Sequence, residues 1–387
     1  MEQKLTIGMA HHNDFDGAYF SIQDIRKELL FNNRVDLLRN IEFVIVENDA
    51  SSQHAQAVQN LSKNGGMTPI RVIDVSDVQG TSATRNKIIE EATGNFVLVM
   101  DCHVLLCPTV KVLEQLFSFM ACNHTSDDLY CGPLVYDNMN NISTHYNDTW
   151  GAQMWGQWGQ AWQCVCESYN FSVTNDDNNN KCSYVSLKDQ RRVDTCEYCD
   201  KSFPVIDHGG HEGKLRKDGY SSIGFSPYNA PFEVFAQGLG LFLTRKNAWL
   251  GFNEHAKGFG GEECVIHAKY RKAGRKTMCL PFLKWLHRFD RPAGVKYPLT
   301  TENKVRNYIL GFTEVGLDME PLKQHFVTEN NFSESHWNDL LNEANSLYGG
   351  QPIGTVSPDQ IMKQIESLQS ELSALEKKKK GKKCCKS

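Results

Sequence analysis

Strand-length apolar segments alternate with helical segments along about the first 120 residues of the chain. The apolar segments cover residues 5–10, 41–46, 70–75 and 96–100, and residues 22–31 and 81–92 carry helical spacing between them. Continuous apolar runs are typical of strands buried on both faces, and their alternation with helices favours βαβ units. The sequence therefore predicts an α/β fold built on a parallel sheet of the kind that binds nucleotides.

Polar residues follow each of these strand segments. They are His11-His12-Asn13-Asp14, Asn48-Asp49-Ala50-Ser51, Ser76-Asp77 and Asp101-Cys102-His103. The carboxyl ends of parallel strands meet at one edge of the sheet, where open α/β sheets bind ligands. We therefore expect a ligand site at this edge.

Asp101 and His103 leave their strand end together, which outlines a divalent-metal site. His287, at the end of an apolar segment, is the candidate third ligand. Two imidazoles with one carboxylate suit Mn²⁺ better than Mg²⁺, because nitrogen donors favour transition metals. The alternatives are a solvated strand end and, for His287, a hydrogen-bonded histidine beside an aromatic segment.

An acidic pair, Glu262 and Glu263, opens a helix predicted over residues 262–273. Together with a metal site, such a pair completes the inventory that a metal-dependent transferase requires. The alternative is that both carboxylates only interact favourably with the helix dipole. A strand predicted at 240–244 and another ending at His287 belong to the same part of the core.

The middle of the chain is rich in cysteine and tryptophan. Cys164 and Cys166 form one short-spaced couple, and Cys196 and Cys199 form another, in a region that shows little apolar content. Four thiolates could hold a structural Zn²⁺; unbound reduced cysteines are the alternative, and a disulfide is the least favoured. Trp155, Trp158 and Trp162 are either core residues or a platform on which an acceptor stacks.

These patterns divide the chain into four parts. They are a nucleotide-binding half at 1–126, a Cys/Trp-rich insertion at 127–232, an acceptor and catalytic half at 233–350, and a tail at 351–387. The tail carries a short apolar seam followed by lysines, which indicates either a helix that packs on the body or an oligomer formed through a coiled coil. Its basic end suits phosphate groups of nucleic acid or lipid.

Composition limits the class of protein. Of 387 residues, 40% are hydrophobic and 22% charged, which is typical of a globular protein and excludes a disordered or fibrous one. The first residues lack the apolar stretch of a signal peptide, and no segment is long enough to span a bilayer. We therefore expect a cytoplasmic protein with reduced thiols.

Taken in order, the motifs resemble those of family 2 type glycosyltransferases of GT-A fold, particularly the polypeptide N-acetylgalactosaminyltransferases and the β-1,4-galactosyltransferases. The resemblance covers residues 5–122 and 235–326. The motifs are His12-Asn13-Asp14, Asn48-Asp49-Ala50-Ser51, Gly80 to Asn86, Asp101-Cys102-His103, and Gly251 to Glu263. In this family an arginine of the third motif faces the nucleotide, and the fourth motif binds the metal.

The resemblance implies a metal-dependent glycosyltransferase of hexosyl or N-acetylhexosaminyl type with a nucleotide-sugar donor, favouring a UDP-linked one. The donor would contact His12, Asn13, Asn48, Asp49, Asp77, Arg85 and Asp101, while Asp101, His103 and His287 hold Mn²⁺ or Mg²⁺. By analogy with the galactosyltransferases, Glu263 would be the general base of an inverting displacement, with Glu262 beside it facing the acceptor. Asn48 departs from the family pattern, so Asp49, Asp74 or Asp77 could read the base instead. Thr84 is a second departure, because it replaces the small alanine beside Arg85.

Two alternatives differ in class. One is a catalytically silent module that binds sugar nucleotides or glycans. The other is a transferase acting on modified DNA or another nucleic acid, which the tryptophans and the lysine tail favour but the net charge of −5 opposes. The sugar, the nucleotide, the acceptor (glycan, lipid-linked glycan or nucleic acid), the stereochemistry and the oligomeric state stay open.

Overall fold

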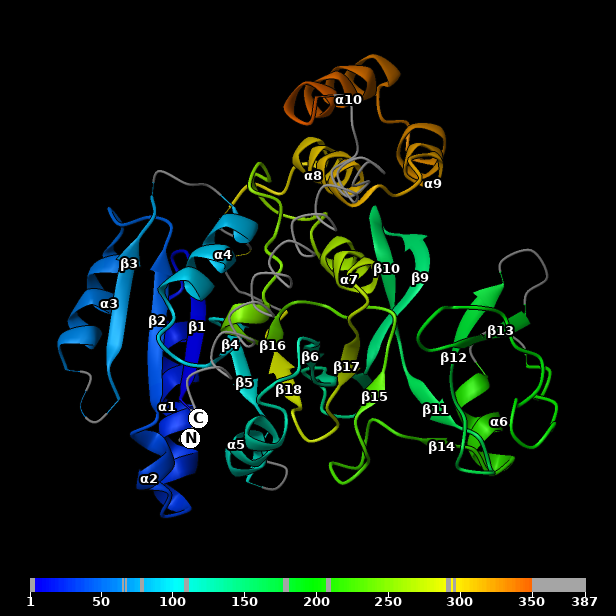
Figure 1. Cartoon of the computed structure of the whole chain (residues 1–387), viewed down its shortest axis with the longest axis horizontal. Helices are drawn as coiled ribbons and strands as arrows, with labels where there is room; N and C mark the ends of the chain where they lie inside the picture. The colour runs from blue at the N-terminus through cyan, green and yellow to red at the C-terminus, as the bar shows by residue number, and fades with distance from the viewer. Residues whose placement is uncertain are drawn as a thin grey trace, which may run out of the picture.

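The computed structural model describes most of the chain up to residue 349. The described residues are 4–64, 66, 68–76, 80–107, 111–176, 181–206, 210–289, 294 and 297–349. The tail at 351–387, with the helix predicted there, lies outside them. Figure 1 shows the N-terminal sheet at one side of the molecule, the helices α8, α9 and α10 above its centre, and a smaller lobe at the other side.

The core is an eight-stranded sheet of order β15-β17-β6-β16-β4-β1-β2-β3. Its parallel part consists of β1 (Leu5–His11), β2 (Ile41–Glu47), β3 (Ile70–Asp74) and β4 (Phe96–Asp101). These four strands lie where the apolar segments predict them. Because β1 is paired with both β2 and β4, the polar residues that follow the three strands meet at one edge.

Helices cover both faces of this sheet (Figure 1). On one face, α1 (Phe15–Phe31), α3 (Gln53–Lys63) and α5 (Val112–Cys122) pack against alternate residues of the strands. On the other, α4 (Thr81–Glu91) and α7 (Glu263–Lys272) pack against the residues between them. Both faces are therefore apolar, which explains why the strand segments read as continuous hydrophobic runs. The short helix α2 (Val35–Leu38) precedes β2.

The remaining strands of the sheet come from later parts of the chain. They are β6 (Leu129–Cys131), β15 (Phe232–Glu233), β16 (Leu241–Arg245) and β17 (Thr277–Cys279). Of these, β6 and the first residue of β15, Phe232, fall within the region 127–232 that the sequence marks as an insertion, so both ends of that region are part of the central sheet. The predicted strand at 240–244 is β16, which runs antiparallel to β4.

A small second sheet places a late segment beside β4. It has the order β5-β18-β7-β8, with β5 (Val104–Leu106), β7 (Leu134–Val135), β8 (Ile142–Ser143) and β18 (Trp285–His287). The antiparallel pairing of β18 with β5 sets His287 opposite Val104, the residue after His103. The register of this pair therefore decides where His287 lies.

The C-terminal helices and a two-stranded ribbon form a second core. The ribbon is β9 (His145–Gly151) with β10 (Met154–Gly159); the helices are α8 (Thr301–Val315), α9 (Glu320–Lys323), α10 (Glu334–Leu347), and a π-helical turn at Gln324–Glu329. Trp155 of the ribbon is 8% exposed and packs among their aromatic rings, so Trp155 is a core residue.

The rest of the Cys/Trp-rich region is a lobe with its own sheet. The strands are β11 (Ala161–Gln163), β12 (Asn170–Asp176), β13 (Lys181–Ser186) and β14 (Ser221–Ser222). The helix α6 (His211–Lys217) lies beside them in the same lobe. Trp162, Phe171, Phe203 and Tyr220 belong to an aromatic cluster inside it. These aromatic residues are sparse in the sequence but gather in one core inside the lobe. Among the described residues, no helix has the length and apolar character to cross a membrane.

Candidate functional site

Asp101, His103 and His287 come together at the carboxyl edge of the sheet. The Nε2 atoms of the two histidines are 3.1 Å apart, and they lie 3.9 and 3.8 Å from Oδ2 of Asp101. All three candidate ligand atoms lie within 4.8 Å of one another. Two atoms bound at right angles to one divalent ion, each at about 2.1 Å, are themselves about 3 Å apart. The two imidazole nitrogens match this separation, and Oδ2 of Asp101 lies within 4 Å of both, so the three side chains converge as candidate ligands of one ion.

Asp14 orients His103. Its Oδ2 atom lies 3.3 Å from Nδ1 of His103, and Arg288 donates to the same carboxylate at 2.9 and 3.1 Å. Burial opposes ionisation of Asp14, but the hydrogen bond from His103 and the charge of Arg288 outweigh it, so the pKa of Asp14 lies well below its usual range. A carboxylate on Nδ1 keeps the proton there and leaves Nε2 as a ligand.

Arg85, on α4, holds two of the predicted carboxylates. Its guanidinium donates to Oδ1 of Asp101 at 3.1 Å and to Oε1 of Glu262 at 3.2 Å, and the Thr81 hydroxyl donates to the same Glu262 oxygen. Arg85 is 4% exposed and Glu262 6%. Burial raises the pKa of Asp101, but the charge of Arg85 and the hydrogen bond with His287 lower it further, so Asp101 is anionic.

Glu263, the first residue of α7, is only partly buried and is fixed by two donors. The backbone N–H of Leu239 donates to Oε1 at 3.0 Å, and the hydroxyl of Tyr146 donates to Oε2 at 3.2 Å. Burial, and after it the charge of Glu262, raises the pKa of Glu263 to about 7. A carboxyl with this pKa can exchange a proton near neutral pH, as a general base must.

A cavity of about 390 Å³ lies beside the triad. Of the residues predicted to contact a donor, His12, Asn48, Arg85 and Asp101 line it. Asn13 donates to Asp49 at 3.1 Å next to this cavity, and Asp49 also accepts from the hydroxyl of Ser51. Asp77 lies outside the described residues. The structure thus brings together residues that follow β1, β2 and β4, in agreement with the shared edge.

Two residues of the site, Tyr146 and Tyr297, carry no sequence signal of their own. Tyr297 packs edge-on against His12 with a centroid distance of 6.0 Å and against Phe259 at 5.6 Å, and all three rings line the cavity. His11 lines it as well, with its Nδ1 atom 2.5 Å from Glu47. Tyr146 reaches Glu263 from the ribbon. Only spatial proximity identifies Tyr146 and Tyr297, since neither belongs to a motif.

The four predicted zinc cysteines also converge, in the lobe. The Sγ atoms of Cys164 and Cys199 are 3.7 Å apart, and those of Cys166 and Cys196 are 3.6 Å apart. All four sulfur atoms lie within 4.8 Å of one another. Both separations are far longer than the roughly 2 Å of a disulfide bond, so the thiols are unlinked.

Residues 7–174 match the family model described as Glycosyl transferase family 2. This range includes β1 to β4, Asp101 and His103, and it ends inside the lobe. No curated protein matches the chain by sequence.

Solved structures resemble the fold of the chain at low sequence identity. The structure of GalNAc-T7 with UDP, GalNAc and Mn²⁺ has a TM-score of 0.50 and 12% identity, over 89% of this chain and 54% of that chain. The present chain therefore spans about half the length of that protein. Staphylococcus aureus TarS (residues 1–349) with UDP-GlcNAc has a TM-score of 0.44 and 12% identity, over 88% of this chain and 80% of that chain.

Proposed function

We propose that this chain, a family 2-like protein of GT-A fold, is a metal-dependent glycosyltransferase that moves a sugar from a nucleotide-sugar donor to a hydroxyl group. The observation that carries the proposal is the convergence of Asp101, His103 and His287 beside a cavity at the carboxyl edge of the sheet. A carboxyl group with a raised pKa, that of Glu263, lies on the neighbouring helix. A metal site and a base are the two parts that such a transfer needs.

The donor half of the site would hold the nucleotide diphosphate. Asp101, His103 and His287 would bind Mn²⁺ or Mg²⁺, of which the two imidazoles favour Mn²⁺. When bound, the ion supplies positive charge for the oxygens of the departing diphosphate. His12, Tyr297 and Phe259 offer ring faces and edges to a base or ribose in the adjoining cavity. We favour a UDP-linked donor.

Glu263 would act on the acceptor. Its two hydrogen bonds, from Leu239 and Tyr146, fix the direction of the carboxylate, and its pKa of about 7 lets it take a proton from an attacking hydroxyl. A base on the acceptor side suits in-line displacement with inversion. Glu262 instead supports the site, because its ion pair with buried Arg85 ties α7 to Asp101.

Calorimetric titration with nucleotide sugars tests the donor site. UDP-linked sugars are followed by GDP-linked ones, each with and without Mn²⁺, on the wild type and on Asp101→Ala. We expect one donor to bind only with Mn²⁺ in the wild type, and the variant to lose that binding. If no donor binds under either condition, the transferase assignment is wrong. Donor binding without any hydrolysis or transfer would favour a catalytically silent binding module.

A zinc ion in the lobe is a separate proposal. Four sulfur atoms placed tetrahedrally at about 2.3 Å from Zn²⁺ are about 3.8 Å apart, close to the 3.7 and 3.6 Å separations in this cluster. Cys164 and Cys196 are buried, and the backbone N–H of Tyr198 lies 3.5 Å from Sγ of Cys196. We propose that Cys164, Cys166, Cys196 and Cys199 bind a structural Zn²⁺.

A further inference from the structure

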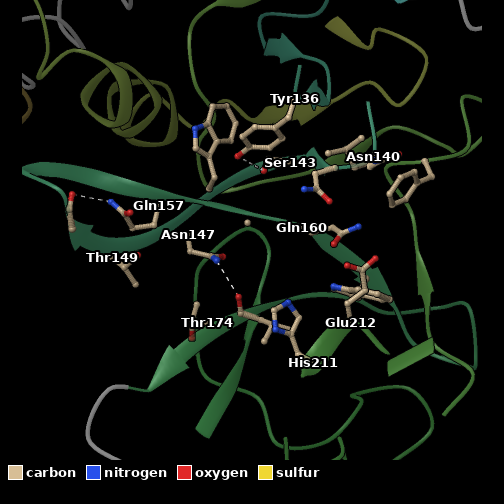
Figure 2. A pocket seen from close by; sticks show the side chains of 18 of the residues that line it. Tyr136, Asn140, Ser143, Asn147, Thr149, Gln157, Gln160, Thr174, His211 and Glu212 are labelled. Atoms are coloured by element: carbon tan, nitrogen blue, oxygen red, sulfur yellow. Dashed lines mark hydrogen bonds between the residues drawn. The ribbon is translucent and has the colours of Figure 1, made fainter. Parts of the chain in front are cut away.

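A groove of about 650 Å³ lies between the ribbon and the lobe, outside the donor site. Figure 2 shows Gln157 and Asn147 of the ribbon on one side, and Thr174, His211 and Glu212 of the lobe on the other. Tyr136 and Ser143 close one end, where their hydroxyl groups are 3.1 Å apart. We call this the amide groove. The donor site described above does not include it.

The polar lining of the amide groove is almost entirely neutral. Amide and hydroxyl side chains dominate it, and among the described residues that line it there is neither a lysine nor an arginine. Glu212 is the only carboxylate in that described lining. A site for phosphate groups needs cationic side chains, so this lining disfavours a nucleic-acid acceptor. Neutral donors and acceptors instead suit a ligand that is covered with hydroxyl groups.

Several of these amides are held in fixed orientations. Asn147 is 4% exposed. Its Oδ1 atom lies 3.1 Å from Nε2 of His145, and its amide nitrogen donates to the carbonyl of Val173 at 3.3 Å. Gln157 donates to the carbonyl of Gly151 at 2.9 Å, and Gln160 donates to the hydroxyl of Ser222 at 2.7 Å. Because the nitrogen of each glutamine is engaged, its amide oxygen is fixed as an acceptor. Preorganised acceptors lose little entropy when they bind a ligand.

Aromatic residues of the lining add an apolar component. Trp158 is only partly buried and lines the groove, whereas Trp162 is fully buried and has an Nε1 atom without a hydrogen-bond partner in the described structure. The C–H faces of a sugar ring stack on an indole ring, while the hydroxyl groups at its rim reach polar side chains. Of Trp155, Trp158 and Trp162, Trp158 is therefore the one suited to be a platform, since the other two are core residues.

Ring contacts connect two residues of the groove, Trp158 and Tyr136, with the candidate catalytic residues. The ring of Trp158 is 4.4 Å from that of Tyr146, whose hydroxyl donates to Glu263. The ring of Tyr136 stacks on Phe289 at 5.9 Å, and Phe289 in turn lies 4.2 Å from the ring of His287. The groove residues Trp158 and Tyr136 thus contact Tyr146 and Phe289, which in turn contact Glu263 and His287.

We propose that the amide groove binds a neutral oligosaccharide as the acceptor, an assignment that rests on the transferase function proposed above. In the reaction, the oxygen of an acceptor hydroxyl bonds to the anomeric carbon of the donor sugar. The bond from that carbon to the diphosphate breaks, its electron pair leaves with the nucleoside diphosphate, and the hydroxyl proton passes to Glu263. Gln157, Gln160 and Trp158 hold the rest of the acceptor.

Binding of defined saccharides tests the groove. The probes are neutral tri- to hexasaccharides of glucose, galactose, mannose and N-acetylglucosamine, with single-stranded and duplex DNA oligonucleotides for comparison. The variants are Gln157→Leu and Gln160→Leu, which keep side-chain size but remove the amide, each checked by thermal unfolding. Gln56→Leu, the same change on the exposed face of α3, is the matched control.

We expect at least one saccharide to bind the wild type and the control, and each groove variant to weaken its binding at least tenfold. The assignment is overturned if none of these saccharides binds, if the groove variants bind as the wild type does, or if the variants weaken DNA binding instead. Donor titration with Mn²⁺ on wild-type protein is measured separately. If a saccharide binds but no donor does, the result counts against the transferase function and not against a glycan site.

Discussion

At the scale of single residues, each candidate catalytic side chain is held by a partner from another element. Asp14 of the β1–α1 junction orients His103, and Arg85 of α4 holds Asp101. Tyr146 of the ribbon holds Glu263. Such contacts fix the direction of a reacting group before a substrate binds, which is what preorganised catalysis requires.

Glu263→Gln should abolish most of the transfer. The carboxyl has a pKa of about 7 and must be deprotonated to accept a proton, so wild-type activity should rise with pH up to about 7 and level off above it. Glutamine cannot accept the proton, and we expect turnover to fall by about 10² to 10⁴. Steady-state rates of the wild type between pH 5 and 9, and of the variant at pH 8, check this.

The same variant, Glu263→Gln, should lose activity but gain stability at alkaline pH. A folded-state pKa raised from 4.5 to about 7 means that the carboxyl contributes stability below pH 4.5, and that this contribution is lost as the pH rises through 7. Glu263→Gln should therefore increase the free energy of unfolding at pH 8 by about 1 to 3 kcal/mol, and change it little at pH 4. Denaturant unfolding at both pH values measures this. A variant less stable at pH 8 would contradict the raised pKa.

At the scale of elements, the start of α4 closes the donor cavity against the segment before α7. Gly80, with a φ of 128°, forms an isolated bridge with Gly258, whose carbonyl accepts from the N–H of Thr81 at 3.1 Å. A Cβ atom on Gly80 would lie 2.8 Å from backbone atoms of Gly258. A side chain at this position therefore has both an unfavourable backbone conformation and no room.

Gly80→Ala should destabilise the fold and weaken donor binding. Backbone strain and the clash with Gly258 together should cost about 1 to 3 kcal/mol. Gly274→Ala is the matched control, because its φ is 71° but nothing lies within 4 Å of its Cβ position. Thermal unfolding and donor titration compare the two. If both variants lose equal stability and donor affinity, the contact with Gly258 has no role of its own.

The next prediction concerns the cysteine cluster of the lobe. Cys196→Ser should lose bound zinc and lower the midpoint of thermal unfolding, because the cluster joins two loops of one small core. Cys122→Ser, at an exposed cysteine outside the lobe, should change neither. Elemental analysis after purification without added metal should find one zinc ion per wild-type chain. A metal-free wild type with unchanged stability would mean that the thiols are simply reduced.

At the scale of the whole molecule, the donor site joins segments from both ends of the described chain. The triad combines β4 with β18, and the donor cavity is lined by residues that range from Ala10 to Asn303 in the sequence. A ligand bound there contacts elements that fold together only in the native state. Binding should therefore stabilise the molecule as a unit.

Donor and Mn²⁺ together should raise the thermal unfolding midpoint of the wild type. At about a hundredfold excess over the dissociation constant, the stabilisation should be about 2.7 kcal/mol. Donor without Mn²⁺ should shift the midpoint of the wild type less. In Asp101→Ala, donor and Mn²⁺ together should not shift the midpoint. Differential scanning fluorimetry measures this. An equal shift in Asp101→Ala would place the donor away from the triad.

Much of this architecture could be predicted from local sequence. The runs before His11, Asn48 and Asp101 predicted three parallel strands and a shared polar edge, because burial on both faces requires uninterrupted apolar residues. The lobe was harder: its aromatic residues are too sparse for a periodic signal, yet they gather into one cluster. Trp155, Trp158 and Trp162 share one sequence pattern, but only Trp158 lies partly open beside the groove.

The sequence by itself determined which strands are buried, where their polar ends lie, and which residue types could bind a metal or take a proton. Tertiary structure alone decided that His287 meets His103, that Arg85 is shared by Asp101 and Glu262, and that Tyr146 reaches Glu263. The physical reason is that periodicity encodes only local conformation and burial. Contacts across 100 or more residues depend on strand register and helix packing, which no local pattern specifies.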